Sequence, residues 1–225
     1  MKSVLVTGAT RGLGWHLVHA LASRGLTVHA AARNAAGARK LAGIDGRVMP
    51  MVLDVDSASD CERLRAWAAA NTLDGLINNA ALAIDQRIGQ MDADAVERCF
   101  RTNAVGPMRI SEALLPALER GQGKRIMHIS SDSASMSLIG DDLYAPYKMS
   151  KAALNMLGRL QAAMLGPRGF TVVCVHPGWI KTDMGGPNAR DDPAMVAGKL
   201  AEMLCTMDGS RNGTYVDFNA NTLPW

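Results

Sequence analysis

The sequence predicts a single-domain α/β protein with a doubly wound, parallel, seven-stranded sheet and helices on both faces. Three observations predict this fold class. Short β-branched runs alternate with longer stretches of helical periodicity throughout the 225 residues. Runs such as VVCV at 172–175 are continuously apolar, which is typical of strands buried on both faces. No linker, repeat or low-complexity segment interrupts the pattern. Residues 1–225 are therefore expected to form one domain.

The expected strands are the β-branched and apolar runs at 3–7, 26–32, 47–55, 73–80, 124–131, 170–178 and 213–219. Pro50 predicts an irregularity early in the third run, because proline cannot donate to a strand ladder. The fourth and fifth runs end in polar residues, NNA and SS. Ligands of such sheets bind beyond the carboxyl ends of the strands, so the polar residues there are the candidates for function.

The expected helices lie between these strands, at 12–24, 57–70, 92–118, 144–165 and 192–207. The first opens on a glycine-rich turn, and Ser57 is a candidate cap for the second. The third is long, and Pro146 falls within the first turn of the fourth, where proline is tolerated. Strand–helix alternation of this kind implies right-handed crossovers between parallel strands.

Composition excludes several classes of protein. With 48% apolar residues, 20% charged residues and a formal charge of +3, the chain has no basic, aromatic-rich stretch of the kind that binds nucleic acid. No apolar run approaches the length of a membrane span, and the N-terminus lacks the apolar region of a signal peptide. The four cysteines show no metal or CxxC spacing, so we expect reduced thiols, no metal and a cytoplasmic location. The fourteen methionines are expected to fill the core.

The first strand end reads TGATRGLG, between an expected strand and an expected helix. Glycine lets the backbone turn sharply and approach a pyrophosphate, and a helix N-terminus supplies free N–H groups. A tight strand–helix turn is the alternative, but this context favours dinucleotide binding. The expected cofactor-binding residues here are Gly8, Thr10, Arg11, Gly12, Leu13 and Gly14.

The second strand ends at Arg33, where an acidic residue would bind the ribose hydroxyls of NAD. Arg33 and Arg11 instead suit a ribose 2′-phosphate, so NADP(H) is expected to be preferred over NAD(H). Asp54 and Val55 end the third strand. The Asp54 carboxylate could accept from the adenine amino group or could cap the strand end, and the sequence leaves both open.

The segments TGATRGLG, NNAA, TNAVG, ISS, YKMSK and HPGWIKTDM occur in an order that resembles the short-chain dehydrogenase/reductase family, across essentially the whole chain. The segment PGWIKTDMGGPNA and the ending LPW resemble its compact C-factor/sniffer-type branch of carbonyl reductases. The resemblance implies a Rossmann fold and an NADP-dependent oxidoreductase. One departure is Ala81, where the family usually has glycine, which adds a methyl group where backbone approaches the cofactor.

The stretch YAPYKMSK holds two Tyr–Lys pairs at i, i+4 spacing, Tyr144–Lys148 and Tyr147–Lys151. The position of YKMSK relative to the other family motifs implies that Tyr147 is the general acid/base and Lys151 its partner. A lysine ammonium about 4 Å away, at an effective dielectric of about 20, would bring a phenol from a pKa of about 10 to near neutrality. Lys151 is also implied to bind the nicotinamide ribose.

A hydroxyl must hold the substrate oxygen, and Ser131, sixteen residues before Tyr147, is the choice. Ser130 should face the other way if the strand alternates to that point, while Ser133 and Ser135 remain alternatives. Asn103 matches the family's helix asparagine, implied to hold a water that links Lys151 to solvent, although an incidental polar residue is a fair alternative. The remaining residues implied to bind cofactor are Asn79, Ala80, Ala81, Pro177, Gly178, Trp179, Ile180 and Thr182. His176 is interpreted as structural.

These expectations describe a reductase, or reverse alcohol dehydrogenase, acting on a small ketone, aldehyde or secondary alcohol. The alternative is a dinucleotide-binding signalling or regulatory protein of the C-factor type with secondary catalytic activity. A short segment of about fifteen residues after Gly178 predicts an open substrate pocket. Its candidate lining is Ser137, Leu138, Tyr144, Trp179 and Met184, each of which could equally be packing. Homodimers or homotetramers through the long helices are implied by the resemblance.

Overall fold

The computed structural model describes residues 1–225 and contains one seven-stranded sheet in the order β3-β2-β1-β4-β5-β6-β7. Every neighbouring pair of strands is parallel, so the predicted fold class is confirmed. The strands are β1 (Ser3–Val6), β2 (Thr27–Ala32), β3 (Val48–Val52), β4 (Gly75–Asn78), β5 (Arg125–Ile129), β6 (Thr171–His176) and β7 (Thr214–Asp217).

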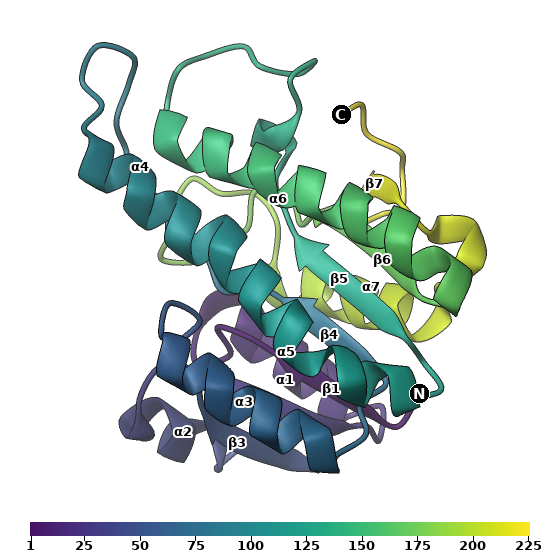
Figure 1. Cartoon of the computed structure of the whole chain (residues 1–225). Coiled ribbons are helices and arrows are strands. Elements are labelled where there is room, and N and C mark those ends of the chain that lie inside the picture. The colour runs from purple at the N-terminus through teal and green to yellow at the C-terminus, as the bar shows by residue number, and fades with distance from the viewer.

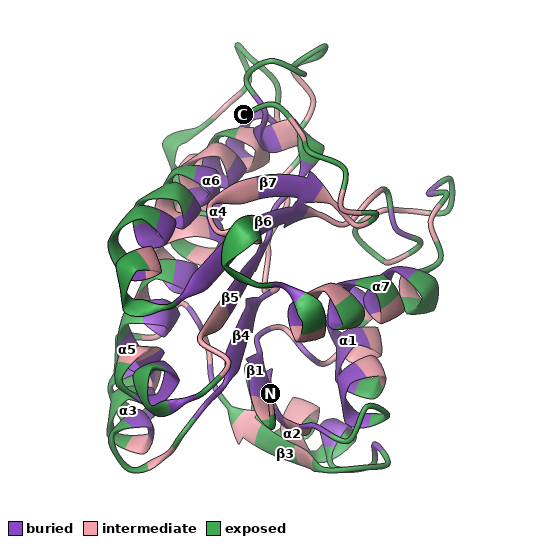
Figure 2. Ribbon diagram, turned by 90° about the vertical axis from the view of Figure 1, so that its right-hand side faces the viewer, coloured by how far each residue is buried: buried purple, intermediate pink, exposed green.

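Helices cover both faces of this sheet (Figures 1 and 2). One face carries α1 (Gly12–Ala22), α2 (Ala35–Leu41) and α7 (Pro193–Thr206). The other carries α3 (Ala58–Ala70), α4 (Ala93–Phe100), α5 (Gly106–Arg120) and α6 (Ala145–Leu165). Short 3₁₀ turns span Asp132–Ala134, Gly166–Arg168 and Gly209–Arg211. No helix has the length and apolar character needed to cross a bilayer.

The core consists of two apolar layers separated by the sheet. In β1, Val4 and Val6 contribute to the layer under α1 and α7, and Leu5 to the layer under α3 and α5. This alternation follows from the two-residue period of a strand. The strands β4, β5 and β6 are buried on both faces, whereas the edge strand β3 exposes Met49 and Val52. The continuously apolar strands are explained by this two-sided burial.

One expectation about packing is wrong, and one helix was not predicted. The methionines do not fill the core: Met127 and Met207 are buried, whereas Met136, Met156 and Met164 are among those that are exposed. The sequence also gave no signal for α2, whose residues AAGARKL lack apolar periodicity. This helix begins because the Asn34 side chain accepts a hydrogen bond from the Gly37 N–H at 2.9 Å.

The long helix expected at 92–118 is present as α4 and α5, joined by a π-helical turn at Arg101–Val105. Its fully buried Asn103 makes reciprocal hydrogen bonds with the Leu82 backbone, accepting from its N–H at 2.8 Å and donating to its carbonyl at 2.7 Å. Asn103 also donates to Ser150 Oγ at 2.8 Å. Such turns occur frequently at functional sites. Here the turn ties α4–α5 to the segment that follows β4.

A chain of polar side chains crosses the buried layer between α5 and α6. His128 on β5 has no exposed surface, and its Nε2 lies 2.8 Å from Gln161 Oε1. Its Nδ1 lies 3.2 Å from Asn78 Nδ2, which in turn is bonded to Ser111. Burial lowers the pKa of His128 to about 4, because desolvation disfavours the imidazolium.

We therefore predict that acid destabilises the fold through His128. Its folded-state pKa lies below the unfolded value of about 6.5, so this contribution is fully present above pH 6.5 and is lost as the pH falls toward 4. The free energy of unfolding should fall by up to about 1.4 kcal/mol per pH unit from this group. Burial lowers the pKa values of His29 and His176 as well, which adds in the same direction.

Urea denaturation between pH 7 and pH 4.5 measures this slope. His128→Gln should flatten it, whereas His19→Gln, at an exposed histidine, should leave it as in the wild type. Equal slopes in the wild type and His128→Gln would contradict the prediction.

Candidate active site

A cavity of about 1060 Å³ lies at the carboxyl edge of the sheet, where the strand order reverses between β1 and β4. Parallel strands place all their carboxyl ends at this edge, so segments far apart in the sequence meet there. All the residues expected to bind cofactor line it: Gly8, Thr10, Arg11, Gly12, Leu13, Gly14, Arg33, Asp54, Val55, Asn79, Ala80, Ala81, Tyr147, Lys151, Pro177, Gly178, Trp179, Ile180 and Thr182.

The glycine-rich turn is closely packed and needs glycine at its key positions. Gly8 and Gly12 have φ values of +65° and +51°, which side chains disfavour. A Cβ on Gly14 would lie 2.2 Å from the Gly8 carbonyl oxygen, and one on Gly8 would lie 2.8 Å from Ala80 Cα. Arg11 precedes α1 without a capping side-chain hydrogen bond. No side chain caps the N–H groups in the first turn of α1, so these groups are free to bind an anion.

The segment after β4 is fixed to the end of β1. The Asn79 amide donates to the Thr7 and Gly8 carbonyls at 2.9 and 3.2 Å. Thr7 Oγ1 accepts from the N–H groups of Asn79 and Ala80 at 3.0 and 3.1 Å. Ala81 follows with a negative φ, so the residue that replaces the family's glycine needs no left-handed conformation. Its methyl group is accommodated without backbone strain.

The end of β2 carries no carboxylate. Arg33 is exposed on the cavity and makes no ion pair, while Arg11 lies 3.5 Å from Asp183 across the cavity mouth. Asp54 Oδ1 accepts from the Asp56 N–H at 3.0 Å. Asp54 thus makes a local turn at the strand end and also lines the cavity.

Ser131 faces the active-site tyrosine. It follows β5 in extended backbone, and its side chain lies close enough to Tyr147 to lower the pKa of the phenol against the effect of burial. Ser130 turns the other way, toward Asn155 at 2.7 Å, as strand alternation predicted. Ser135 is fully buried away from the cavity lining, whereas Ser133 lies at the cavity. Ser131 is thus the serine that the fold brings to Tyr147.

Tyr147 and Lys151 lie one turn apart on α6 and both line the cavity. The Lys151 ammonium is 2% exposed, donates to the Ile129 carbonyl at 2.7 Å and lies 5.6 Å from the centre of the Tyr147 ring. Burial lowers the pKa of Lys151 to about 8 and raises the pKa of Tyr147 to about 12. The expectation that Lys151 brings the phenol near neutrality is wrong in this structure, because the desolvation of the phenol outweighs the opposing effect of Ser131.

The second Tyr–Lys pair is not a pair at all. Tyr144 precedes α6 with a φ of +55°, is exposed and borders the cavity. Lys148 forms an ion pair with Asp141 at 2.6 Å. Tyr144 therefore borders the cavity without pairing with Lys148.

The candidate substrate residues divide into two groups. Tyr144, Trp179 and Met184 line the cavity and expose large apolar surfaces at its mouth. Ser137 and Leu138 lie outside the cavity lining, and Ser137 Oγ instead donates to the Trp225 carbonyl at 3.1 Å. Sequence reasoning missed Asp132 and Arg190, which also line the cavity. No spacing relative to a motif marks either residue.

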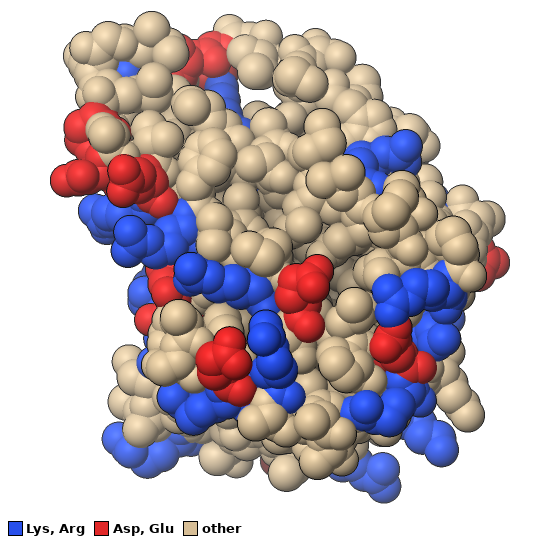
Figure 3. Space-filling model, in the orientation of Figure 1, with Lys and Arg blue, Asp and Glu red and all other residues tan.

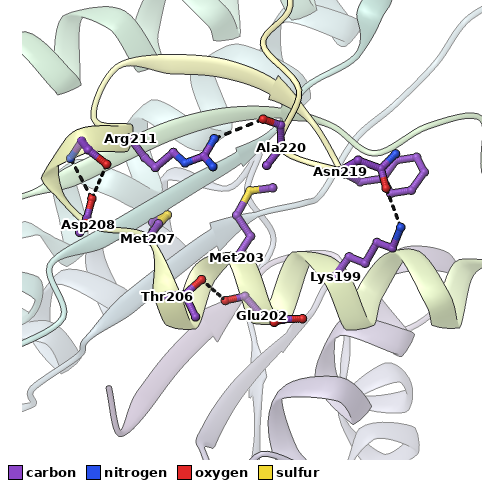
Figure 4. Close-up of a pocket in the computed structure, with 11 residues that line it drawn as sticks. Lys199, Glu202, Met203, Thr206, Met207, Asp208, Arg211, Asn219 and Ala220 are labelled. Atoms are coloured by element: carbon purple, nitrogen blue, oxygen red, sulfur yellow. Dashed lines mark hydrogen bonds between the residues drawn. The ribbon is translucent and has the colours of Figure 1, made fainter.

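A second hollow of about 460 Å³ lies between α7 and the chain after β7 (Figure 4). Its cations are already engaged: Lys199 donates to Asn219 Oδ1 at 2.5 Å, and Arg211 to the Ala220 carbonyl at 3.2 Å. None of the motif residues lines it. The large cavity is therefore the candidate active site. No cluster of three or more histidine, cysteine or acidic side chains forms a metal site.

Comparisons with known proteins identify the family of the chain. The family model described as short chain dehydrogenase matches residues 2–193. C-signal of Myxococcus xanthus is 38% identical over 167 residues, which cover 72% of this chain and 100% of that protein. Human L-xylulose reductase is 31% identical over 82% of this chain and 74% of its own length.

Two solved structures superpose over the whole chain. Carbonyl reductase Sniffer of D. melanogaster has a TM-score of 0.92 at 29% identity, with 100% of both chains covered. The NADPH-bound carbonyl reductase from chicken fatty liver has a TM-score of 0.91 at 28% identity, covering 100% of this chain and 99% of that one. The family match, these relatives and the sheet order lead to one conclusion: the chain belongs to the short-chain dehydrogenase/reductase family, in its C-factor/sniffer-type branch.

Proposed function

We propose that the protein is an NADPH-dependent carbonyl reductase, or the reverse alcohol dehydrogenase, with Tyr147 as general acid/base. The observation that carries the proposal is that a single cavity is lined both by the glycine-rich turn and by Ser131, Tyr147 and Lys151. The glycine-rich turn suits a dinucleotide because Gly8, Gly12 and Gly14 line the cavity where α1 begins without a capping side chain. NADPH supplies a hydride when bound there.

The chain's own residues supply the proton and fix the substrate oxygen. With a pKa near 12, Tyr147 is protonated at neutral pH and is the donor that a developing alkoxide needs. Lys151 is charged below about pH 8, so its ammonium stabilises the phenolate left after proton transfer. The Ser131 hydroxyl orients the carbonyl oxygen beside the phenol. The roles of the other cofactor-binding residues are inferred from the positions of the matching motifs in the family.

The Asn103 side chain has a structural role in the site, and any part of Asn103 in the proton relay falls to its main chain. Its amide is occupied by Leu82 and Ser150, so it has no free donor for a water relay. The π-helical turn around Asn103 changes the helical hydrogen bonding there. We propose that a main-chain carbonyl of this turn holds the relay water linked to Lys151.

The apolar surfaces of Tyr144, Trp179 and Met184 favour a substrate with an apolar or aromatic group beside its carbonyl. The carbonyl reductases and L-xylulose reductases among its relatives support a small-molecule carbonyl substrate. The four unpaired cysteines fit a reducing compartment such as the cytoplasm.

Removing the proton donor tests the mechanism. Tyr147→Phe should lower kcat for ketone reduction by about 10³-fold, since positioned general acids contribute roughly 10²–10⁴-fold. NADPH affinity, measured by fluorescence titration, should change little and shows that the variant is folded. Substantial turnover by pure Tyr147→Phe would refute the role given to the phenol.

Arg33 is predicted to set the cofactor preference. Arg33→Ala should lower kcat/KM for NADPH by about 10–100-fold, the value of a charge-assisted contact, and leave NADH almost unaffected. The NADPH-bound and NADP-bound relatives support this preference. Arg39→Ala is the matched control, because Arg39 is an exposed arginine on α2 outside the cavity. Equal efficiency of the wild type with NADPH and NADH would contradict the prediction.

A signalling or regulatory protein that binds a dinucleotide is the second candidate, favoured by the similarity to C-signal. The intact Ser131–Tyr147–Lys151 arrangement favours chemistry, because cofactor binding alone needs no proton donor. A panel of ketones and aldehydes with NADPH separates the two. Turnover of none of them would favour the signalling role.

The outer face of α6 supports self-association. Met156, Leu160 and Met164 recur every fourth residue and are all exposed. Figure 3 shows that the surface over α6 carries few charges, in contrast to the charged band over α3 and α5. We propose that a second copy of the chain covers this apolar stripe.

Sedimentation velocity tests the association. The wild type should sediment as a dimer or larger, and Leu160→Glu should shift it to a monomer because a buried carboxylate would be unpaired. Glu112→Ala on α5 serves as an exposed control outside the stripe. A wild type that stays monomeric at micromolar concentrations would rule out this interface.

A further inference from the structure

One peptide group beside the active site is held by side chains on both of its sides. The carbonyl of Ser131 accepts a hydrogen bond from the Tyr215 hydroxyl. The N–H on the other side of the same peptide, that of Asp132, donates to His176 Nδ1 at 2.9 Å. Tyr215 lies on β7 and His176 ends β6, so two neighbouring strands reach the same peptide plane.

Tyr215 is firmly fixed. Its side chain is 1% exposed, and the Trp225 ring packs on it with 5.1 Å between ring centres. The chain after β7 folds back along the strand: the Leu223 N–H donates to the Tyr215 carbonyl at 2.8 Å, and the Asp217 N–H to the Asn221 carbonyl at 2.9 Å. Burial and these contacts therefore hold the Tyr215 side chain in one position.

His176 can accept the Asp132 N–H only while Nδ1 is unprotonated, which places the ring proton on Nε2. Burial lowers the pKa of His176, which favours this neutral form, although Asp132, Asp217 and Asp191 oppose the shift. The acceptor is therefore present at neutral pH.

The orientation of this peptide determines where the Ser131 hydroxyl points. Ser131 Oγ accepts from the Ser133 N–H and donates to Asp132 Oδ1, both at 3.2 Å. Both partners lie in the 3₁₀ turn that starts at the held peptide. Rotation of the peptide plane would move the turn and, with it, the groups that orient the hydroxyl.

We propose that Tyr215 and His176 are positioning residues that fix the Ser131–Asp132 peptide and thereby aim the Ser131 hydroxyl at the substrate oxygen. The inference rests on the proposed carbonyl reduction. On this proposal, turnover also depends on β7, which carries Tyr215, and on the segment after β7, which packs against it. Neither residue donates a proton to the substrate, and neither is expected to alter cofactor affinity.

Tyr215→Phe removes the hydroxyl and keeps the ring. We expect kcat to fall about 10-fold with the KM for NADPH unchanged, because small misplacements of a positioned group cost up to about 100-fold. In a Ser131→Ala background the same change should cost nothing further, since there is no hydroxyl left to aim. Thr214→Val is the matched control: it removes a β7 hydroxyl that donates to the Arg211 carbonyl at 2.8 Å, away from the site.

Substitutions of His176 provide an independent test. His176→Leu removes the acceptor and should lower kcat, whereas His176→Asn offers an amide oxygen near the place of Nδ1 and should recover much of the loss. Amide hydrogen exchange of residues 131–134 should accelerate in Tyr215→Phe and His176→Leu but not in Thr214→Val. This readout needs no substrate.

The outcomes separate this inference from the proposed function. Unchanged kcat and unchanged exchange in Tyr215→Phe would overturn it, as would a full additional loss on top of Ser131→Ala. Absence of any carbonyl turnover by the wild type would count against the reductase instead, with the exchange measurement still deciding whether the peptide is held.

Discussion

The buried ammonium of Lys151 is the interaction on which the arrangement of the site depends. A charge removed from water is costly unless hydrogen bonds replace its hydration. The Ile129 carbonyl, at the end of β5, supplies one such bond. That contact fixes the first turns of α6 against the end of the sheet. Tyr147, one turn earlier on the same helix, is thereby placed beside Ser131, two residues beyond Ile129.

Other contacts fix the remaining sides of the cavity. The side chains of Thr7 and Asn79 join the ends of β1 and β4 by hydrogen bonds to main-chain groups of the facing segment, which fixes the glycine-rich turn against Ala80. Asn103 ties the segment after β4 to α6 through Ser150, whose hydroxyl donates to the Tyr147 carbonyl at 2.7 Å. Tyr215 and His176 act on the opposite side, behind Ser131. The reacting groups thus lie among buried, mutually supporting polar contacts.

The sequence predicted what depends on local periodicity and motif spacing. Strand and helix positions and the glycine turn are encoded by neighbouring residues, whereas the choice of Tyr147 over Tyr144 came from the resemblance to the family. The short helix α2 was missed because its alanines and glycine carry no apolar period. The pKa of Tyr147 was misjudged because only the charge of Lys151 was considered, while burial depends on the whole fold. The roles of Tyr215 and His176 left no signal, since each acts on a main-chain group of a distant segment.

The most direct test of the central claim is the transfer of deuterium from NADPH that carries deuterium at both positions of nicotinamide C4. The acceptor is the carbonyl compound that reacts fastest in a panel of ketones and aldehydes, and the product is analysed by mass spectrometry. We predict one deuterium on the carbinol carbon with the wild type and almost none in the same time with Tyr147→Phe. A product without deuterium, or equal labelling by the two proteins, would contradict the account.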